Sequence, residues 1–284
     1  MCPASFDYHR PASVAEAIQL LSRDGVKALA GGHSLIPAMN LRVAQPSELV
    51  DIGRLEELRG IHVEGGRLII GALTTHAQIA TSVEVQQHCA ALAAACSTVG
   101  DPQVRNWGTL GGNLAHADPA SDPPTVAMAC DAVIHTEGVN GKRAIGVEDF
   151  FVDLFTVDLQ PGELITRVEI ASLSNWKTAY AKLPHPASRY AVVGVCVALR
   201  LAANGACDQA RVAVGGATAK PTRARQAEKA LIGSSLDAAA LEASAGAISK
   251  DIGDQAVSDI YANATYRRAM AGVLLKRAVK AALA

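Results

Sequence analysis

Two pairs of adjacent glycines stand out among the residues that could do chemistry. The first pair lies in Ala30-Gly31-Gly32-His33-Ser34-Leu35, directly after an apolar segment, and the second in Thr109-Leu110-Gly111-Gly112-Asn113. Adjacent glycines let the backbone approach a ligand closely and adopt positive φ, so that successive N–H groups converge on an anion. Two such loops could clamp a diphosphate from both sides, which indicates a dinucleotide cofactor.

The first loop carries further donors in its side chains. Ser34 supplies a hydroxyl, and His33 supplies a ring N–H. The loop does not follow the G-x-G-x-x-G pattern, so a Rossmann site is not indicated. A plain strand-to-helix turn is the alternative for this loop. We expect the pairs Gly65-Gly66 and Gly215-Gly216 to be structural, the first in a hairpin turn and the second at a strand end.

The second loop is chemically more specific. Thr109 offers a hydroxyl, Gly111 and Gly112 offer backbone N–H groups, and Asn113 can orient the turn. Asp122 lies ten residues beyond Gly112, where its carboxylate could accept hydrogen bonds from ribityl or ribose hydroxyls. The alternative for Asp122 is a helix N-cap before the two prolines that follow it, and the two roles are compatible.

Other chemistries are not indicated. Neither G-x-S-x-G nor H-E-x-x-H occurs, and the eight histidines are scattered along the chain. We expect His76 and His88 on solvated helix faces. None of the six cysteines forms a C-x-x-C pair, which argues against an iron–sulfur cluster or a structural zinc on this chain. Most of them are expected to be small buried apolar residues.

Length and composition favour a globular protein with a sizeable core. The chain has 284 residues, half of them hydrophobic, and a formal net charge of −1. The balanced charge argues against nucleic-acid binding and against binding to a membrane surface, since both need a basic patch. No apolar run reaches the length of about 18 residues that spans a bilayer, and the N-terminus lacks a signal-peptide pattern. We therefore expect a cytoplasmic protein without membrane association.

Local patterns predict the elements that position the first loop. They are a helix over residues 14–22 opened by a capping box at Ser13, a strand over 26–30, a helix over 35–43 and a strand over 49–52. The second helix begins at the first glycine loop, which is a favourable place for an anion.

The rest of the chain falls into two parts, with a boundary near residue 174. Before it we expect a hairpin over 61–70, a helix after the capping box Thr75 to Gln78, a helix over 85–99, and strands over 132–135, 143–147 and 164–170. Residues 100–124 are rich in Gly, Pro, Asn and Asp, which predicts a long ordered loop. After the boundary we expect strands over 191–201 and 210–214 and three helices beyond Pro221.

Several motifs in register resemble one known family. They are Ser5-Phe6-Asp7-Tyr8-His9-Arg10-Pro11, residues 30–37, residues 109–113, Ser121-Asp122-Pro123, Pro161-Gly162-Glu163-Leu164-Ile165 and Tyr190-Ala191-Val192-Val193-Gly194-Val195. In order and spacing they are similar to the FAD-binding medium subunit of the molybdenum hydroxylases, the group of aerobic carbon monoxide dehydrogenase and xanthine dehydrogenase. The resemblance covers essentially the whole chain.

The resemblance implies an α+β fold. Residues 1–174 would form a two-subdomain FAD-binding fold of the PCMH type, with subdomains at about 1–57 and 58–174. Residues 175–284 would form a small C-terminal domain with an antiparallel sheet and helices. The implied cofactor-binding residues are Ala30, Gly31, Gly32, His33, Ser34, Leu35, Val99, Thr109, Gly111, Gly112, Asn113, Asp122, Leu164 and Lys182. Val99 would pack by the isoalloxazine, and Leu164 and Lys182 would lie near the flavin and adenine ends.

The resemblance also implies a function. The chain would carry FAD, accept electrons from two [2Fe–2S] clusters on a small partner subunit, and pass them to an external acceptor. A large subunit with a molybdenum cofactor would hydroxylate the substrate, within a dimer of heterotrimers, so this chain would hold no catalytic residue and no metal. We expect residues 99–107, with Asp101, Arg105 and Asn106, to face a partner.

Two alternatives are a self-contained flavin oxidase of related fold, with FAD attached covalently through His33, and a binding module that has lost its cofactor. One departure from the family pattern concerns the flavin pocket. Arg189 stands where the family often has an acidic residue, which changes the electrostatics expected around the ring.

Overall fold

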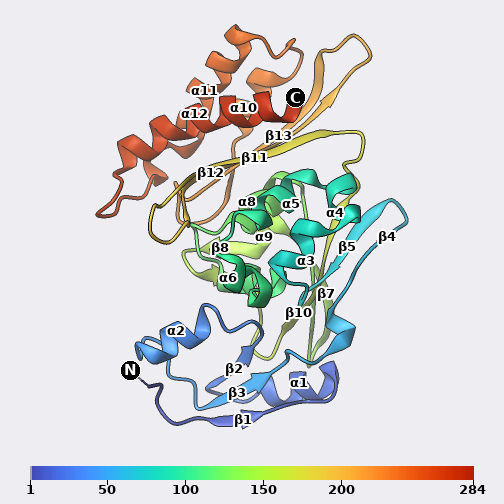
Figure 1. Cartoon of the computed structure of the whole chain (residues 1–284), viewed down its shortest axis with the longest axis vertical. Coiled ribbons are helices and arrows are strands. Elements are labelled where there is room, and N and C mark those ends of the chain that lie inside the picture. The colour runs from blue at the N-terminus through green and yellow to red at the C-terminus, as the bar shows by residue number, and fades with distance from the viewer. Residues whose placement is uncertain (1) are drawn as a thin grey trace.

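Three main sheets, each next to its own hydrophobic core, follow one another along the chain (Figure 1). The computed structural model describes residues 2–284. The first sheet lies at the N-terminal end of the molecule, and the last sheet with its helices lies at the opposite end (Figure 1). This arrangement confirms the expected α+β fold with a C-terminal antiparallel sheet.

The first sheet is parallel, with strand order β1-β3-β2. Its elements are β1 (Asp7–His9), α1 (Val14–Leu21), β2 (Val26–Leu29), α2 (Leu35–Asn40) and β3 (Glu48–Asp51). The Ser13 side chain accepts from the Glu16 backbone N–H, which confirms the predicted helix start. Because the strands are parallel, the segments that follow β1, β2 and β3 meet at one edge of the sheet, and the first glycine loop is one of them.

The second sheet is antiparallel, with strand order β4-β5-β10-β6-β7. Its strands are β4 (Ile61–Glu64), β5 (Arg67–Gly71), β6 (Val133–Gly138), β7 (Gly141–Gly146) and β10 (Leu164–Ala171). The helices between β5 and β6 include α3 (His76–Thr81), α4 (Val83–His88) and α5 (Ala90–Ser97). They pack on this sheet, since Ile79 and Leu92 share one buried cluster with Ile70 and Val168. The capping box at Thr75 is confirmed.

Two expectations for this region are wrong. Residues 100–124 do not form a long loop but contain α6 (Pro102–Trp107), α7 (Leu110–His116) and the start of α8 (Asp122–Ala129). Side-chain caps explain the difference, because Asp101 accepts from the Val104 N–H and Thr109 accepts from the Gly112 N–H. The expected single helix over 85–99 is interrupted at Cys89, whose φ of −160° separates α4 from α5.

Smaller elements complete the first two parts of the molecule. They are η1 (Glu56–Leu58), α9 (Val147–Phe150) and the short hairpin of β8 (Phe151–Asp153) and β9 (Thr156–Val157).

The third sheet is antiparallel, with strand order β11-β12-β13-β14. It comprises β11 (Lys177–Pro184), β12 (Ala191–Leu201), β13 (Cys207–Gly215) and β14 (Thr222–Arg223), followed by α10 (Arg225–Leu231), α11 (Ala238–Ile252), η2 (Gly253–Gln255) and α12 (Ala264–Leu283). The predicted three helices are confirmed, whereas β11 was not expected. Val195 and Val197 belong to the core under these helices, and Cys196 and Ala198 belong to the core of the second sheet. The third sheet therefore packs on both sides.

Candidate flavin site

The first glycine loop offers a row of free backbone donors. Gly32 adopts a φ of +73°, a conformation that favours glycine. The N–H groups of Gly31, Gly32, His33 and Ser34 have no hydrogen-bond acceptor within the described chain, residues 2–284. The loop carbonyls are used, since Gly32 accepts from the Ile36 N–H at 3.0 Å and thereby closes the turn into α2. Four consecutive free donors are a suitable lining for an anion.

The imidazole of His33 folds back onto its own loop. Its Nδ1 lies 2.9 Å from the carbonyl oxygen of Gly31, so Nδ1 carries the proton that it donates and Nε2 stays available. Ser34 precedes α2, but its hydroxyl makes no capping hydrogen bond to that helix. Both side chains thus keep a polar group that a ligand could use.

The second glycine pair lies in the first turn of α7, so the expected second glycine loop is a helix start whose N–H donors are already used. Gly111 donates to the Ala72 carbonyl at 2.8 Å, Gly112 donates to the Thr109 hydroxyl at 3.2 Å, and Asn113 donates to the Thr109 carbonyl at 3.0 Å. A Cβ on Gly111 would lie 2.6 Å from the Ala72 Cβ and 2.9 Å from its carbonyl oxygen. The absence of a side chain at Gly111 therefore serves close packing against the turn that follows β5 and not the approach of a ligand.

The two loops lie against each other, although they come from different sheets. A Cβ on Gly31 would collide with the carbonyl of Trp107, and a Cβ on Gly112 would lie 3.6 Å from the Ala30 Cβ. Gly31 thus lets the first loop pack on the end of α6. The predicted convergence of the two glycine pairs is observed.

Asn113 carries an unsatisfied polar atom at this junction. Its side-chain N–H donates to the Ser121 hydroxyl at 3.1 Å, which ties the second loop to the start of α8. The side-chain oxygen Oδ1 is buried and has no hydrogen-bond partner among the described residues. A buried acceptor of this kind calls for a donor from outside the chain, such as a ligand hydroxyl.

Asp122 is held by two partners from β11. Its Oδ1 accepts from the Tyr180 hydroxyl at 2.6 Å, and its Oδ2 accepts from the Lys182 ammonium at 2.8 Å. Burial raises the pKa of Asp122, and the Lys182 charge opposes that shift. The N-cap of α8 is Ser121, so Asp122 is not the cap that its alternative reading proposed. Asp122 is instead the centre of a buried polar cluster.

Lys182 links this cluster to two further segments. Besides Asp122, its ammonium donates to the Thr98 carbonyl at 3.0 Å and to the Arg189 carbonyl at 2.8 Å. All three donors of the ammonium are therefore used, and its side chain is only 7% exposed. Val99 follows Thr98 directly and is half-buried, with its carbonyl accepting from the Arg105 guanidinium at 2.9 Å. Lys182 and the Val99 segment thus lie next to each other.

Leu164 lies apart from this polar cluster. It is a buried member of the core that contains Val50, Ile52 and Leu73, and Ala30 packs against the same core. Leu164 therefore belongs to the core on which the start of the first loop packs. Arg189 is exposed and adopts a φ of +62°, and its contact with the cluster is made by its carbonyl.

One residue of the cluster, Tyr180, was missed by the sequence analysis. Tyr180 is half-buried, and both desolvation of its hydroxyl and the Asp122 carboxylate raise the pKa of that hydroxyl. A Cβ on Gly194 would collide with this hydroxyl, so glycine at that position makes room for Tyr180. Tyr180 and Lys182 are two positions apart, so on a strand their side chains point to the same face. This spacing could have indicated a shared site, but only if residues 177–184 had been recognised as a strand.

The expectation for His76 is wrong. Its side chain is 2% exposed and lies against Gly108, whose Cβ would be 2.9 Å from the ring. Burial lowers the pKa of His76 to about 4, with a smaller contribution from the Arg105 charge. His88 is half-buried, with Nδ1 at 2.6 Å from the Ser172 hydroxyl. Five cysteines are buried, as expected.

Within residues 2–284, no three His, Cys, Asp or Glu side chains gather as a possible metal site. In the same part of the chain, no helix combines the length and apolar character needed to cross a bilayer.

The two glycine pairs face each other from different parts of an α+β fold, an arrangement that suits a dinucleotide cofactor. Residues 4–172 match the family described as "FAD binding domain in molybdopterin dehydrogenase", and residues 178–282 match "CO dehydrogenase flavoprotein C-terminal domain". The chain belongs to the family of FAD-binding medium subunits of the molybdenum hydroxylases. Proteins of this family are subunits of flavin-dependent oxidoreductases.

The relatives match over nearly the full length of the chain. This chain is 37% identical over 289 residues to the carbon monoxide dehydrogenase medium chain of Hydrogenophaga pseudoflava, and the match covers 100% of this chain and 99% of that one. It is 38% identical over 281 residues to the glyceraldehyde dehydrogenase medium chain of Sulfolobus acidocaldarius, covering 99% of each. A solved structure of carbon monoxide dehydrogenase from Hydrogenophaga pseudoflava matches with a TM-score of 0.95 at 38% identity, over 100% of this chain and 99% of that chain.

Proposed function

We propose that this chain holds FAD non-covalently and acts as an electron-transfer subunit. It would accept electrons from [2Fe–2S] clusters on a partner subunit and pass them to an external acceptor. In this proposal residues 1–174 hold the cofactor, with subdomains at about 1–57 and 58–174, and residues 175–284 form the C-terminal domain. The observation that carries the proposal is the row of four free N–H groups at residues 31–34, placed against the second loop.

The residues present fit a flavin dinucleotide. The free N–H groups of the first loop and the Ser34 hydroxyl would bind the diphosphate, because backbone donors and hydroxyls satisfy phosphate oxygens. The hydroxyl of Thr109 would contribute from the second loop. The orphaned Oδ1 of Asn113 would accept from a cofactor hydroxyl, and Asp122 retains lone pairs for the same purpose.

FAD supplies the electron-accepting chemistry, and the chain supplies binding and electrostatics. Lys182 balances the charge of Asp122 in a buried position, so the carboxylate can stay fixed as an acceptor. The Lys182 contacts to the Thr98 and Arg189 carbonyls hold the segment before Val99 and the loop between β11 and β12 in place. Leu164 would support the first loop through the core on which Ala30 packs.

The proposed partners are a small iron–sulfur subunit and a large molybdenum subunit, in a dimer of heterotrimers located in the cytoplasm. Support comes from the relatives, whose names describe medium chains of dehydrogenases. Helix α6 supports the proposed contact surface at residues 99–107, because none of its residues is buried. Trp107, at its end, is 64% exposed and adjoins the first glycine loop.

Reconstitution tests this function. The purified chain, loaded with FAD, should be reduced by dithionite but not by any substrate of the complex. Adding the co-encoded small and large subunits should produce substrate-dependent bleaching of the flavin. Substrate turnover by the chain alone would contradict the proposal and favour the self-contained oxidase. Flavin that stays with the protein after denaturation, and is lost in His33→Ala, would identify the covalent form.

A further inference from the structure

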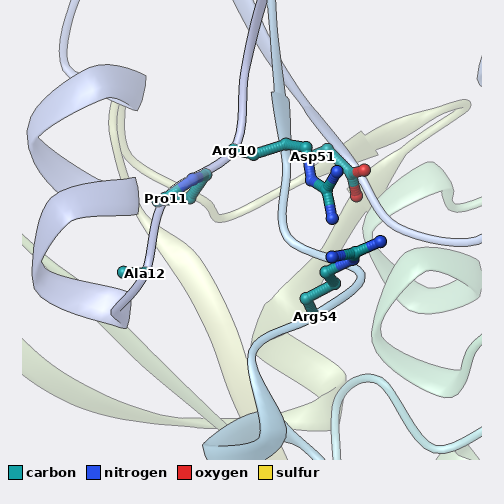
Figure 2. Close-up of a pocket in the computed structure, with 5 residues that line it drawn as sticks. All are labelled: Arg10, Pro11, Ala12, Asp51 and Arg54. Carbon is teal, nitrogen blue, oxygen red and sulfur yellow. The ribbon is translucent and has the colours of Figure 1, made fainter.

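A cavity outside the glycine loops lies at the carboxyl edge of the first sheet. It has a volume of about 410 Å³ and is lined by Arg10, Pro11, Ala12, Asp51 and Arg54 (Figure 2). Arg10 directly follows β1, and Arg54 lies in the segment that follows β3. Ligands of open α/β sheets bind outside the carboxyl ends of the strands, so this is a favourable place for a site.

The two arginines of this cavity have no acidic partner. Within residues 2–284, no carboxylate lies within 4.0 Å of the guanidinium of Arg10 or of Arg54. Figure 2 shows that the two guanidinium groups point toward the same space, beside Asp51. Two facing like charges repel each other, and an anion between them would relieve that repulsion.

Asp51 offsets only one of the two positive charges, and its oxygens accept hydrogen bonds from neutral groups. Its Oδ2 accepts from the Tyr8 hydroxyl, and its Oδ1 accepts from the Gly53 N–H at 2.8 Å. The lining therefore carries two positive charges and one negative charge. The same carboxylate keeps free lone pairs, which could accept from ligand hydroxyls at the edge of the cavity.

We propose that the cavity between Arg10 and Arg54 binds the phosphate group of a nucleotide. Guanidinium groups recognise phosphate oxygens through paired, charge-assisted N–H donors. The volume exceeds what an inorganic phosphate fills and lies in the range of small-molecule sites. Asp51 would accept from the ribose hydroxyls of the same ligand. FAD has a single diphosphate, which the proposed function places at the first glycine loop, so the ligand of this cavity would be a separate nucleotide.

Calorimetric titration of the full-length chain with ADP tests the site, in FAD-loaded and in FAD-depleted protein. We expect ADP to bind more tightly than inorganic phosphate. The double variant Arg10→Gln/Arg54→Gln should weaken ADP binding by about ten- to a hundredfold, because charge-assisted hydrogen bonds are lost. Lys27→Ala, which removes an exposed cation from β2 of the same sheet, should leave ADP binding unchanged.

The two forms of the protein show whether the cavity is separate from the flavin site. ADP binding to the FAD-loaded chain, weakened in the double variant, would support the proposal. ADP binding only to the FAD-depleted chain would show that ADP occupies the flavin site, and it would overturn the proposal. Absence of ADP binding in both forms, or ADP binding that the double variant leaves intact, would also overturn it. A chain that binds ADP through the arginines but no FAD would refute only the flavin function.

Discussion

The ammonium of Lys182 lies 2.8 Å from the carboxylate of Asp122, and both side chains are at least nine-tenths buried. The two residues are sixty positions apart in the chain and belong to β11 and α8. Their pairing joins the third sheet to the helix that follows the second glycine loop.

Lys182→Met should destabilise the chain strongly. It leaves the Asp122 carboxylate buried without its counter-charge, which costs about 3–5 kcal/mol. Urea unfolding at pH 7 measures the loss. The double variant Lys182→Met/Asp122→Leu should recover much of it, because it removes both charges. A single variant as stable as the parent protein would contradict this account of the pair.

Gly32→Ala should lower FAD affinity in addition to stability. The φ of +73° at Gly32 costs an alanine about 1–2 kcal/mol, and the new Cβ would lie 3.1 Å from the Ile36 side chain. Gly65→Ala is the matched control, because Gly65 also has positive φ but no atom near its Cβ position. Both variants should lose stability, and only Gly32→Ala should lose flavin in a fluorescence titration. Equal flavin affinity in the two would exclude the first loop from the site.

Gly111→Ala should destabilise the chain whether or not flavin is bound. Its Cβ would press on Ala72, in the turn that follows β5, and overpacking of this kind costs about 1–3 kcal/mol. Thermal unfolding of FAD-loaded and FAD-depleted protein measures the effect in both states. A variant of normal stability that fails to bind FAD would instead assign Gly111 a direct contact with the cofactor.

Protonation of His76 should lower the free energy of unfolding as the pH falls from about 6.5 to about 4. The ordinary pKa of about 6.5 applies to the unfolded chain, whereas burial holds the folded pKa at about 4. Between these pH values the unfolded chain binds a proton at His76 and the folded chain does not. This difference lowers the free energy of unfolding by up to about 3 kcal/mol across the window. His76→Leu should remove this contribution, as seen in urea unfolding at several pH values. His62→Gln, on an exposed position of β4, is the control. Parallel pH profiles for His76→Leu and the parent protein would contradict the assignment.

Strands β2 and β3, the helix start at Ser13 and the capping box at Thr75 could be predicted from sequence, because each rests on local signals. The convergence of the two glycine pairs was inferred from the ligand that they could share, and strand β1 was not expected. Residues 100–124 were misread although their signals are local too. Glycine and proline content suggested a loop, but Asp101 and Thr109 each cap a short helix. Strand β11 was missed because Lys177–Pro184 lacks a clear alternation of apolar and polar residues.

The contacts inside the site depend on tertiary packing, which a single sequence does not reveal. The partners of Asp122 come from a strand sixty positions away, and the N–H of Gly111 is taken by Ala72 of a different element. The burial of His76 follows from the close approach of Gly108 and not from the pattern of its own helix. Family resemblance suggested candidate site residues, and the structure separates the backbone donors that are free from those that are used.

Titration of the flavin-depleted full-length chain with FAD tests the central claim most directly. Absorbance at the flavin band should saturate at one FAD per chain. Acid precipitation should then release all of that flavin into the supernatant. A chain that binds no FAD, or one that keeps the flavin in the precipitated protein, would contradict the account of a non-covalent site between the two glycine loops.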